Sequence, residues 1–145
     1  MTNEVKQGGV LSPYLFSLYL DPLINKIKNS GFGCHVGKTA INVFVYADDV
    51  VLLAPTITSL KRMVDISEEY GKSHKLQFNS IKSEIVIFNN NKNIKIENLK
   101  ILLNDEEIKI SESYKHLGVT LNNKNAIDFK DIIKEMKIKC NAIKN

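Results

Sequence analysis

Two adjacent carboxylates, Asp48 and Asp49, lie between two short apolar runs, 41–45 and 50–54. Both runs are rich in β-branched and aromatic residues and are too short for a buried helix, so they predict two strands joined by a turn, with both faces buried. Like charges this close repel each other, and an apolar surround makes their ionisation more costly. A divalent cation would neutralise the pair, because Mg²⁺ prefers one or two carboxylates together with substrate phosphates. The pattern therefore predicts a metal site at the tip of a hairpin.

The tetrapeptide Tyr46–Asp49, taken alone, has a second interpretation as a solvated Asp-Asp turn. In an extended chain Tyr46 and Asp48 would share one face, with Ala47 and Asp49 on the other. The two carboxylates can converge on one site only if the backbone turns there. Turn chemistry alone would favour Asn-Gly or Asp-Gly over Asp-Asp.

The segment before the hairpin combines a glycine pair with a helix start. Gly8 and Gly9 remove side-chain bulk, and Gln7 can both donate and accept hydrogen bonds. Ser12 and Pro13 suit the N-cap and the first helical position, and a helix start offers free N–H groups to anions. Gln7 also fits an ordinary polar turn residue. The helix is predicted to run to Gly31 and to bury a stripe made of Leu15, Phe16, Tyr19, Leu20, Leu23, Ile24 and Ile27.

The remaining chain predicts a second helix and several short strands. Thr56 or Thr58 can cap the helix, whose apolar stripe comprises Leu60, Met63, Val64 and Tyr70. Strands are expected at 76–79, 85–88, 94–96, 101–103, 108–110 and 114–121, with Gly118 inside the last and a turn at 104–107. A final helix is expected from Ile127. The predicted fold class is α+β, a mostly antiparallel sheet with helices packed on one face.

Four segments together carry a family resemblance: Lys6–Pro13, the Tyr46–Asp49 box, Leu76–Ser83 and Ser113–Val119. In this order and spacing they resemble the palm of a reverse transcriptase of the non-LTR (LINE-type) retrotransposon family, from about Val5 to about Leu121. The family usually carries a glycine where Glu4 stands. A fragment of a group II intron maturase is the nearest alternative, and Tyr114–Gly118 favours the retrotransposon type.

The resemblance implies an RNA-directed DNA polymerase that joins nucleotides to a primer 3′-hydroxyl with two metal ions, Mg²⁺ or Mn²⁺, held ~3.5–4 Å apart. It implies that residues 1–121 are a polymerase-palm-like partial domain and that residues 122–145 are a helical extension toward a thumb. The fingers and the strand with the family's first catalytic aspartate would be missing. Neither Asp21 nor Asp65 can replace that aspartate, because each lies within a predicted helix. The chain alone is therefore expected to be inactive.

The resemblance also assigns roles to residues. Asp48 and Asp49 would be catalytic metal ligands, and Lys82 would act near the triphosphate, as a general acid for pyrophosphate or to steady its charge. The residues expected to contact the incoming dNTP or the RNA template are Gln7, Gly8, Gly9, Ser12, Pro13 and Tyr46. Those expected to contact the DNA primer are Tyr114, Leu117 and Gly118. Lys82 could instead be simply solvated, and the primer candidates could serve only sheet packing.

The composition of the 145 residues agrees with these expectations without demanding them. A net charge of +4 suits a polyanionic partner, although Arg62 is the only arginine for bidentate phosphate contacts. Cys34 and Cys140 form no metal-ligand pattern.

No signal peptide or membrane span is recognisable, so we expect an intracellular, soluble protein, in the nucleus or the cytoplasm. Two other hypotheses stay open: a noncatalytic nucleic-acid-binding remnant, and a defunct gene fragment.

Overall fold

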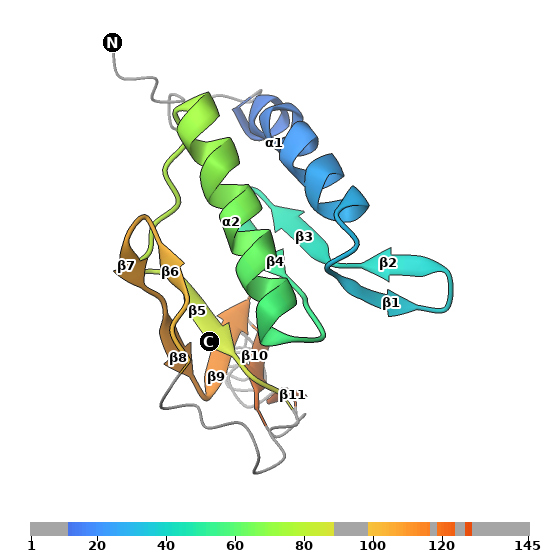
Figure 1. Ribbon diagram of the computed structural model, residues 1–145, viewed down its shortest axis with the longest axis vertical. Helices are drawn as coiled ribbons and strands as arrows, with labels where there is room; N and C mark the ends of the chain where they lie inside the picture. The colour runs from blue at the N-terminus through green and yellow to red at the C-terminus, as the bar shows by residue number, and fades with distance from the viewer. Residues whose placement is uncertain (1–11, 89–98, 117–118, 124–126, 129–145) are drawn as a thin grey trace, which may run out of the picture. The chain divides into compact units, whose positions relative to one another are not determined.

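The computed structural model describes residues 12–88, 99–116, 119–123 and 127–128 (Figure 1). The chain divides into two compact units, one ending at Phe78 and the other beginning at Asn79. Helices and mostly antiparallel strands agree with the predicted α+β class. The described strands form five separate small sheets rather than the single sheet expected. Most pairs join strands that follow each other directly, because two-residue loops bring sequence neighbours together at once.

The first unit contains two helices and two hairpins. Its elements in order are α1 (Ser12–Asn29), β1 (Cys34–Val36), β2 (Thr39–Ile41), β3 (Val43–Tyr46), β4 (Asp49–Leu52) and α2 (Ile57–His74). Helix α1 begins at the predicted Ser12-Pro13 pair and continues through Pro22. Thr56 is the N-cap of α2, since its hydroxyl accepts a hydrogen bond from the backbone N–H of Ser59 at 3.1 Å.

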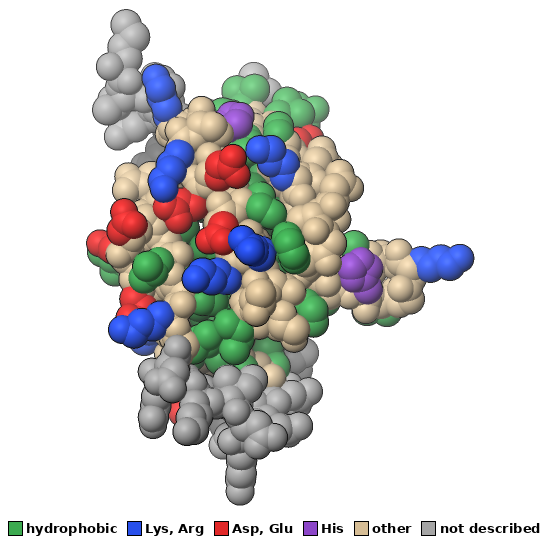
Figure 2. Space-filling view, in the orientation of Figure 1, with side chains coloured by type: hydrophobic (Ala, Val, Ile, Leu, Met, Phe, Trp, Pro, Cys, Tyr) green, Lys and Arg blue, Asp and Glu red, His purple; other side chains and the backbone are tan. Residues whose placement is uncertain are grey.

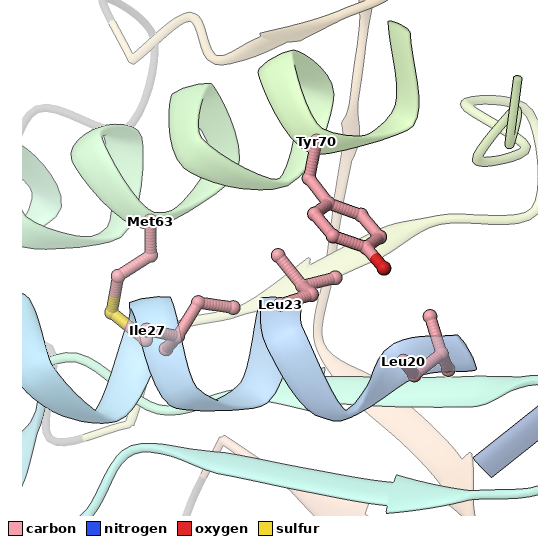
Figure 3. Close-up of a cluster of buried hydrophobic side chains, with 5 residues drawn as sticks. All are labelled: Leu20, Leu23, Ile27, Met63 and Tyr70. Atoms are coloured by element: carbon pink, nitrogen blue, oxygen red, sulfur yellow. The ribbon is translucent and has the colours of Figure 1, made fainter. Parts of the chain in front are cut away.

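The core of this unit lies between the two helices and one face of the β3–β4 hairpin. Figure 3 shows its fully buried side chains, which are Leu20, Leu23 and Ile27 of α1 and Met63 and Tyr70 of α2. Partly buried residues of the hairpin pack against this cluster, namely Val43, Val45, Val50 and Leu52. The predicted stripe of α1 is thus only partly core. Its first turns keep Leu15 57% and Tyr19 40% exposed, because the described neighbours cover mainly the C-terminal half of the helix.

Gly71 allows the backbone at Leu76 to pack closely against the end of α2. The residue is buried, and a Cβ built on it would lie 2.5 Å from the carbonyl oxygen of Leu76. The Leu76 N–H donates to the Gly71 carbonyl at 2.9 Å, and Lys75 adopts the left-handed conformation (φ 56°) that turns the chain back. The close approach of the Leu76 carbonyl therefore requires a glycine at position 71.

The second unit is built from short strands. They are β5 (Glu84–Val86), β6 (Leu102–Leu103), β7 (Glu106–Glu107), β8 (Lys109–Ser111), β9 (Ser113–His116), β10 (Val119–Asn122) and β11 (Ile127–Asp128). Strands β5 and β8 pair in parallel, whereas β6–β7 is a hairpin and β9, β10 and β11 form an antiparallel sheet.

Several predicted strand positions need correction. Residues 76–79 are irregular, because Leu76 bonds back to α2 and Asn79 accepts hydrogen bonds within its own turn. Segment 114–121 is not one strand: β9 ends at His116 and β10 starts at Val119, and Gly118 lies outside the described residues. Where the final helix was expected to begin, Ile127 and Asp128 form β11. The strand expected at 94–96 and the residues after 128 lie outside the described part of the chain.

Candidate active site

The β3–β4 hairpin places both acidic residues at its tip. The strands pair from Val43 opposite Leu52 to Tyr46 opposite Asp49, which leaves Ala47 and Asp48 as the loop. The backbone therefore turns at the acid pair, as the metal-site prediction requires. Ala47 has a φ of 51°, and this left-handed conformation costs a non-glycine residue roughly 1–2 kcal/mol.

The surroundings of the carboxylates differ from the expectation. Asp48 and Asp49 are exposed, and the outer face of the hairpin leaves Phe44 50% and Tyr46 61% exposed. The prediction that both faces are buried is wrong, because the helices pack on one face only. Water can therefore hydrate the two charges, and desolvation no longer argues for a cation. The mutual repulsion of the neighbouring acids remains as an argument.

Neither acid at the tip is neutralised by a described protein group. No hydrogen-bond donor or cation of residues 12–88, 99–116, 119–123 or 127–128 contacts either carboxylate. Nor do these residues contain a group of three or more His, Cys, Asp or Glu side chains able to hold a metal ion. The available donor set is thus two exposed carboxylates. It fits Mg²⁺, which keeps several waters and is commonly bound by one or two carboxylates with substrate phosphates.

The expected nucleotide and template residues are only partly described. Ser12 and Pro13 start α1, in the same unit as the acidic hairpin. Gln7, Gly8 and Gly9 lie outside the described residues. Tyr46 projects from the outer face of β3, the face turned away from the helices, together with Phe44.

Lys82 lies in the second unit, on a turn that the protein fixes through other residues. The Asn79 side-chain oxygen accepts a hydrogen bond from the Lys82 N–H at 3.0 Å. The Asn79 carbonyl accepts from the Ser83 hydroxyl at 2.8 Å, and the buried Ser80 hydroxyl donates to the Glu106 carboxylate. The Lys82 side chain is exposed, so a defined turn presents this cation to solvent.

Of the expected primer residues, only Tyr114 is described. It lies on β9 opposite Leu121 of β10 and is half-buried. Leu117 and Gly118 lie outside the described residues. Tyr114 thus belongs to a hairpin rather than to the single strand that the sequence predicted.

Asn42, at the base of the hairpin, is a buried polar residue to which the sequence analysis assigned no role. Asn42 precedes β3 and is only 2% exposed, and its side-chain Nδ2 donates to the Ile27 carbonyl at 3.1 Å. A polar residue inside the apolar run 41–45 is the signal that could have found it, because a buried amide needs a specific partner.

The surface carries charges of both signs. On the face shown in Figure 2, Lys and Arg side chains alternate with Asp and Glu rather than forming one basic patch. Within the described residues no helix combines the length and apolar character needed to cross a membrane. The charge pattern of this face thus adds little to the net charge as an argument for a nucleic-acid partner.

Comparison with known proteins decides the family. A sequence profile described as reverse transcriptase (RNA-dependent DNA polymerase) matches residues 1–121. The chain belongs to the reverse transcriptase family. This membership confirms the expectation drawn from the four sequence segments, and the acidic hairpin lies within the matched range.

Similar proteins come from R2 retrotransposable elements. The chain is 34% identical over 122 residues to the Pol polyprotein of an R2 element from Bradysia coprophila, covering 79% of the chain and 14% of that protein. It is 31% identical over 134 residues to the one from Nasonia vitripennis, covering 87% and 13%, respectively. For the R2DM element of Drosophila melanogaster the identity is 37% over 78 residues, covering 54% and 7%. No solved structure matches.

These similarities confirm a partial reverse-transcriptase domain of the non-LTR type. The chain spans 7% to 14% of the length of these three relatives. The relatives' names describe large polyproteins, so the activity and partners of the complete enzyme are a matter of proposal for this chain.

Proposed function

We propose that the β3–β4 hairpin is the metal-binding element of a polymerase palm, with Asp48 and Asp49 as ligands of Mg²⁺ or Mn²⁺. The observation that carries this proposal is a pair of exposed neighbouring carboxylates at a strained two-residue turn, without a neutralising partner among the described residues. An external cation would supply the missing positive charge.

In nucleotidyl transfer, the hairpin would hold the Asp48 and Asp49 carboxylates in position to bind the metal ions. Bound cations would activate the primer 3′-hydroxyl and stabilise the departing pyrophosphate. Asp48 in the loop and Asp49 at the start of β4 would each supply carboxylate oxygens, and the packed inner face of the hairpin would hold them in place. We propose that another segment of the polymerase supplies a third carboxylate, together with the fingers, so residues 1–121 form only part of the palm.

Other residues would bind the substrates around this centre. Lys82, presented on its fixed turn, would neutralise the triphosphate of the incoming dNTP or donate a proton to pyrophosphate. The start of α1 and Tyr46 would face the dNTP and the RNA template, and the β9–β10 hairpin with Tyr114 would contact the DNA primer. The region after residue 121 would lead toward a thumb.

A Mn²⁺ titration of the chain, followed by electron paramagnetic resonance, tests the metal site. We expect Asp48→Asn and Asp49→Asn each to weaken Mn²⁺ binding at least about tenfold, which corresponds to about 1.4 kcal/mol. Asp105→Asn is the matched control, since Asp105 is an exposed acid at the tip of the β6–β7 hairpin. Equal affinity of all three variants and the original chain would contradict the proposal.

Primer extension with Mg²⁺ or Mn²⁺ tests the expectation that a further carboxylate is required. The purified chain should not extend an RNA-templated primer, and robust template-directed synthesis would show that residues 1–145 are sufficient. If the chain binds RNA or DNA equally well without divalent ions, and Asp48→Asn leaves that binding unchanged or improves it, the noncatalytic nucleic-acid-binding function replaces the polymerase proposal.

A further inference from the structure

Asn42 joins the base of the acidic hairpin to the end of α1. Its Nδ2 donates to the carbonyl of Ile27, in the last turn of the helix, at 3.1 Å. Its own carbonyl accepts from the Leu53 N–H at 2.8 Å, and the Leu53 carbonyl accepts from the Cys34 N–H at 3.4 Å. A single buried residue thus connects α1, the start of β3 and the end of β4.

Gly33 makes room for this junction. A Cβ built on Gly33 would overlap the Asn42 side chain, including its Cβ, Cγ and Nδ2 atoms. The chain between α1 and β1 can therefore pass Asn42 only with a glycine at this position. Residues from two separate segments fit each other here, which indicates a specific arrangement rather than incidental packing.

The side-chain hydrogen bond of Asn42 contributes little to the free energy of folding. Its Oδ1 is buried without a hydrogen-bond partner among the described residues, which is unfavourable. The Ile27 carbonyl also accepts from the Ser30 hydroxyl at 2.7 Å and from the Ser30 N–H at 3.2 Å, so it stays satisfied without Asn42. An apolar side chain of the same shape would remove the unpaired oxygen and leave no new unpaired group.

The junction instead determines where the hairpin tip lies along α1. Figures 1 and 3 show the β3–β4 hairpin running alongside the helix, and Asn42 connects the two at the hairpin's base. From Asn42 to Asp48 the strand covers roughly 20 Å at ~3.3 Å per residue. From Ile27 back to Ser12 the helix covers roughly 22 Å at ~1.5 Å per residue. The two lengths are similar, so a change of register at the base shifts the carboxylates by the same amount relative to the start of α1.

We propose that Asn42 is a positioning residue, which sets Asp48 and Asp49 relative to the start of α1 for metal and nucleotide binding. This inference rests on the proposed function of the hairpin. Directional bonding by the amide fixes one register between strand and helix, whereas apolar contacts alone tolerate sliding.

Asn42→Leu tests the inference, because leucine has nearly the same shape and cannot donate to Ile27. We expect an unchanged or raised unfolding midpoint but Mn²⁺ binding weakened about tenfold, as is typical when a supporting contact of a metal site is removed. Ser67→Ala is the matched control: Ser67 is also buried and donates to a helix carbonyl, Met63, but it lies within α2. Because the Met63 carbonyl keeps its helical hydrogen bond and alanine favours a helix, this control should leave the unfolding midpoint nearly unchanged and Mn²⁺ affinity within about twofold.

A second measurement, without metal, separates the inference from the proposed function. Nuclear Overhauser contacts between the methyl groups of Val45 or Val50 and those of Leu20 or Leu23 report the register of hairpin and helix. They should change in Asn42→Leu and not in Ser67→Ala. Unchanged contacts would overturn the positioning role, as would equal Mn²⁺ affinity of Asn42→Leu and the original chain. If neither Asp48→Asn nor Asp49→Asn changes the Mn²⁺ affinity, the proposed metal site is wrong. The methyl contacts would then still show whether Asn42 sets the register of hairpin and helix.

Discussion

Two hairpins have acidic tips, β3–β4 in the first unit and β6–β7 in the second. Their loops have the same length, but the backbone strain and the partners of the acidic side chains differ. In β6–β7 the loop residues Asn104 and Asp105 have positive φ angles of 53° and 64°, which these residue types tolerate. The strand acids there have partners: Glu106 accepts the Ser80 hydroxyl, and Glu107 lies 3.7 Å from the Lys100 ammonium. Every feature of this tip agrees with ordinary folding rules.

The β3–β4 tip breaks those rules twice. Ala47 carries the positive φ that glycine or asparagine would adopt at lower cost, and two neighbouring carboxylates lack a partner within the described residues. Local features that work against folding concentrate at functional sites, where binding or catalysis requires them. The contrast supports the assignment of the first tip as the metal site and of the second as a structural turn.

The largest expected effect comes from placing a β-branched residue at the left-handed position of each tip. Ala47→Val and Asp105→Val should each destabilise the chain by about 1–2 kcal/mol, because branching at Cβ clashes with the backbone at positive φ. Denaturant unfolding measures this cost. Only Ala47→Val should also reduce Mn²⁺ affinity, since only its loop carries the proposed ligands. A loss of affinity in both variants would mean that global destabilisation is the cause, and the contrast between the tips would fail.

A smaller effect tests whether the acids of the second tip serve the fold. Ser80→Ala removes the donor to Glu106 and should cost about 0.5–1.5 kcal/mol, the usual contribution of a hydrogen bond. Asp48→Asn should cost nothing, because no described partner is lost and the repulsion from Asp49 is relieved. Thermal unfolding of both variants gives the comparison, with Mn²⁺ affinity expected to fall only in Asp48→Asn. A cost for Asp48→Asn equal to that of Ser80→Ala would show that the first tip is structural as well.

The sequence predicted those parts of the site that depend on local rules. The start of α1 at Ser12 and Pro13 and the Thr56 cap each follow from the preferences of a few neighbouring residues. The hairpin itself was predictable because its two apolar runs are short and β-branched.

Features that depend on distant residues were not predictable in this way. The exposure of Phe44 and Tyr46 follows from helices that cover a single face of the hairpin. The requirement for glycine at positions 33 and 71 comes from Asn42 and from the Leu76 carbonyl, respectively. The sequence alone did not predict that β9 ends at His116 and β10 starts at Val119, because glycine is common both in strand bulges and in turns.

The smallest expected effect uses the neighbouring β1–β2 hairpin as an internal standard. Its loop, Gly37-Lys38, has a positive φ (60°) at the first position only, the same pattern as Ala47-Asp48. Ala47→Gly should therefore stabilise the chain and Gly37→Ala should destabilise it, each by about 0.5 kcal/mol, since relief of backbone strain exceeds the entropy that glycine adds to the unfolded state. Thermal unfolding of the two single variants gives the signs. If Ala47→Gly lowers stability, alanine is not strained at the tip, and only the unpaired carboxylates would distinguish the first tip from the second.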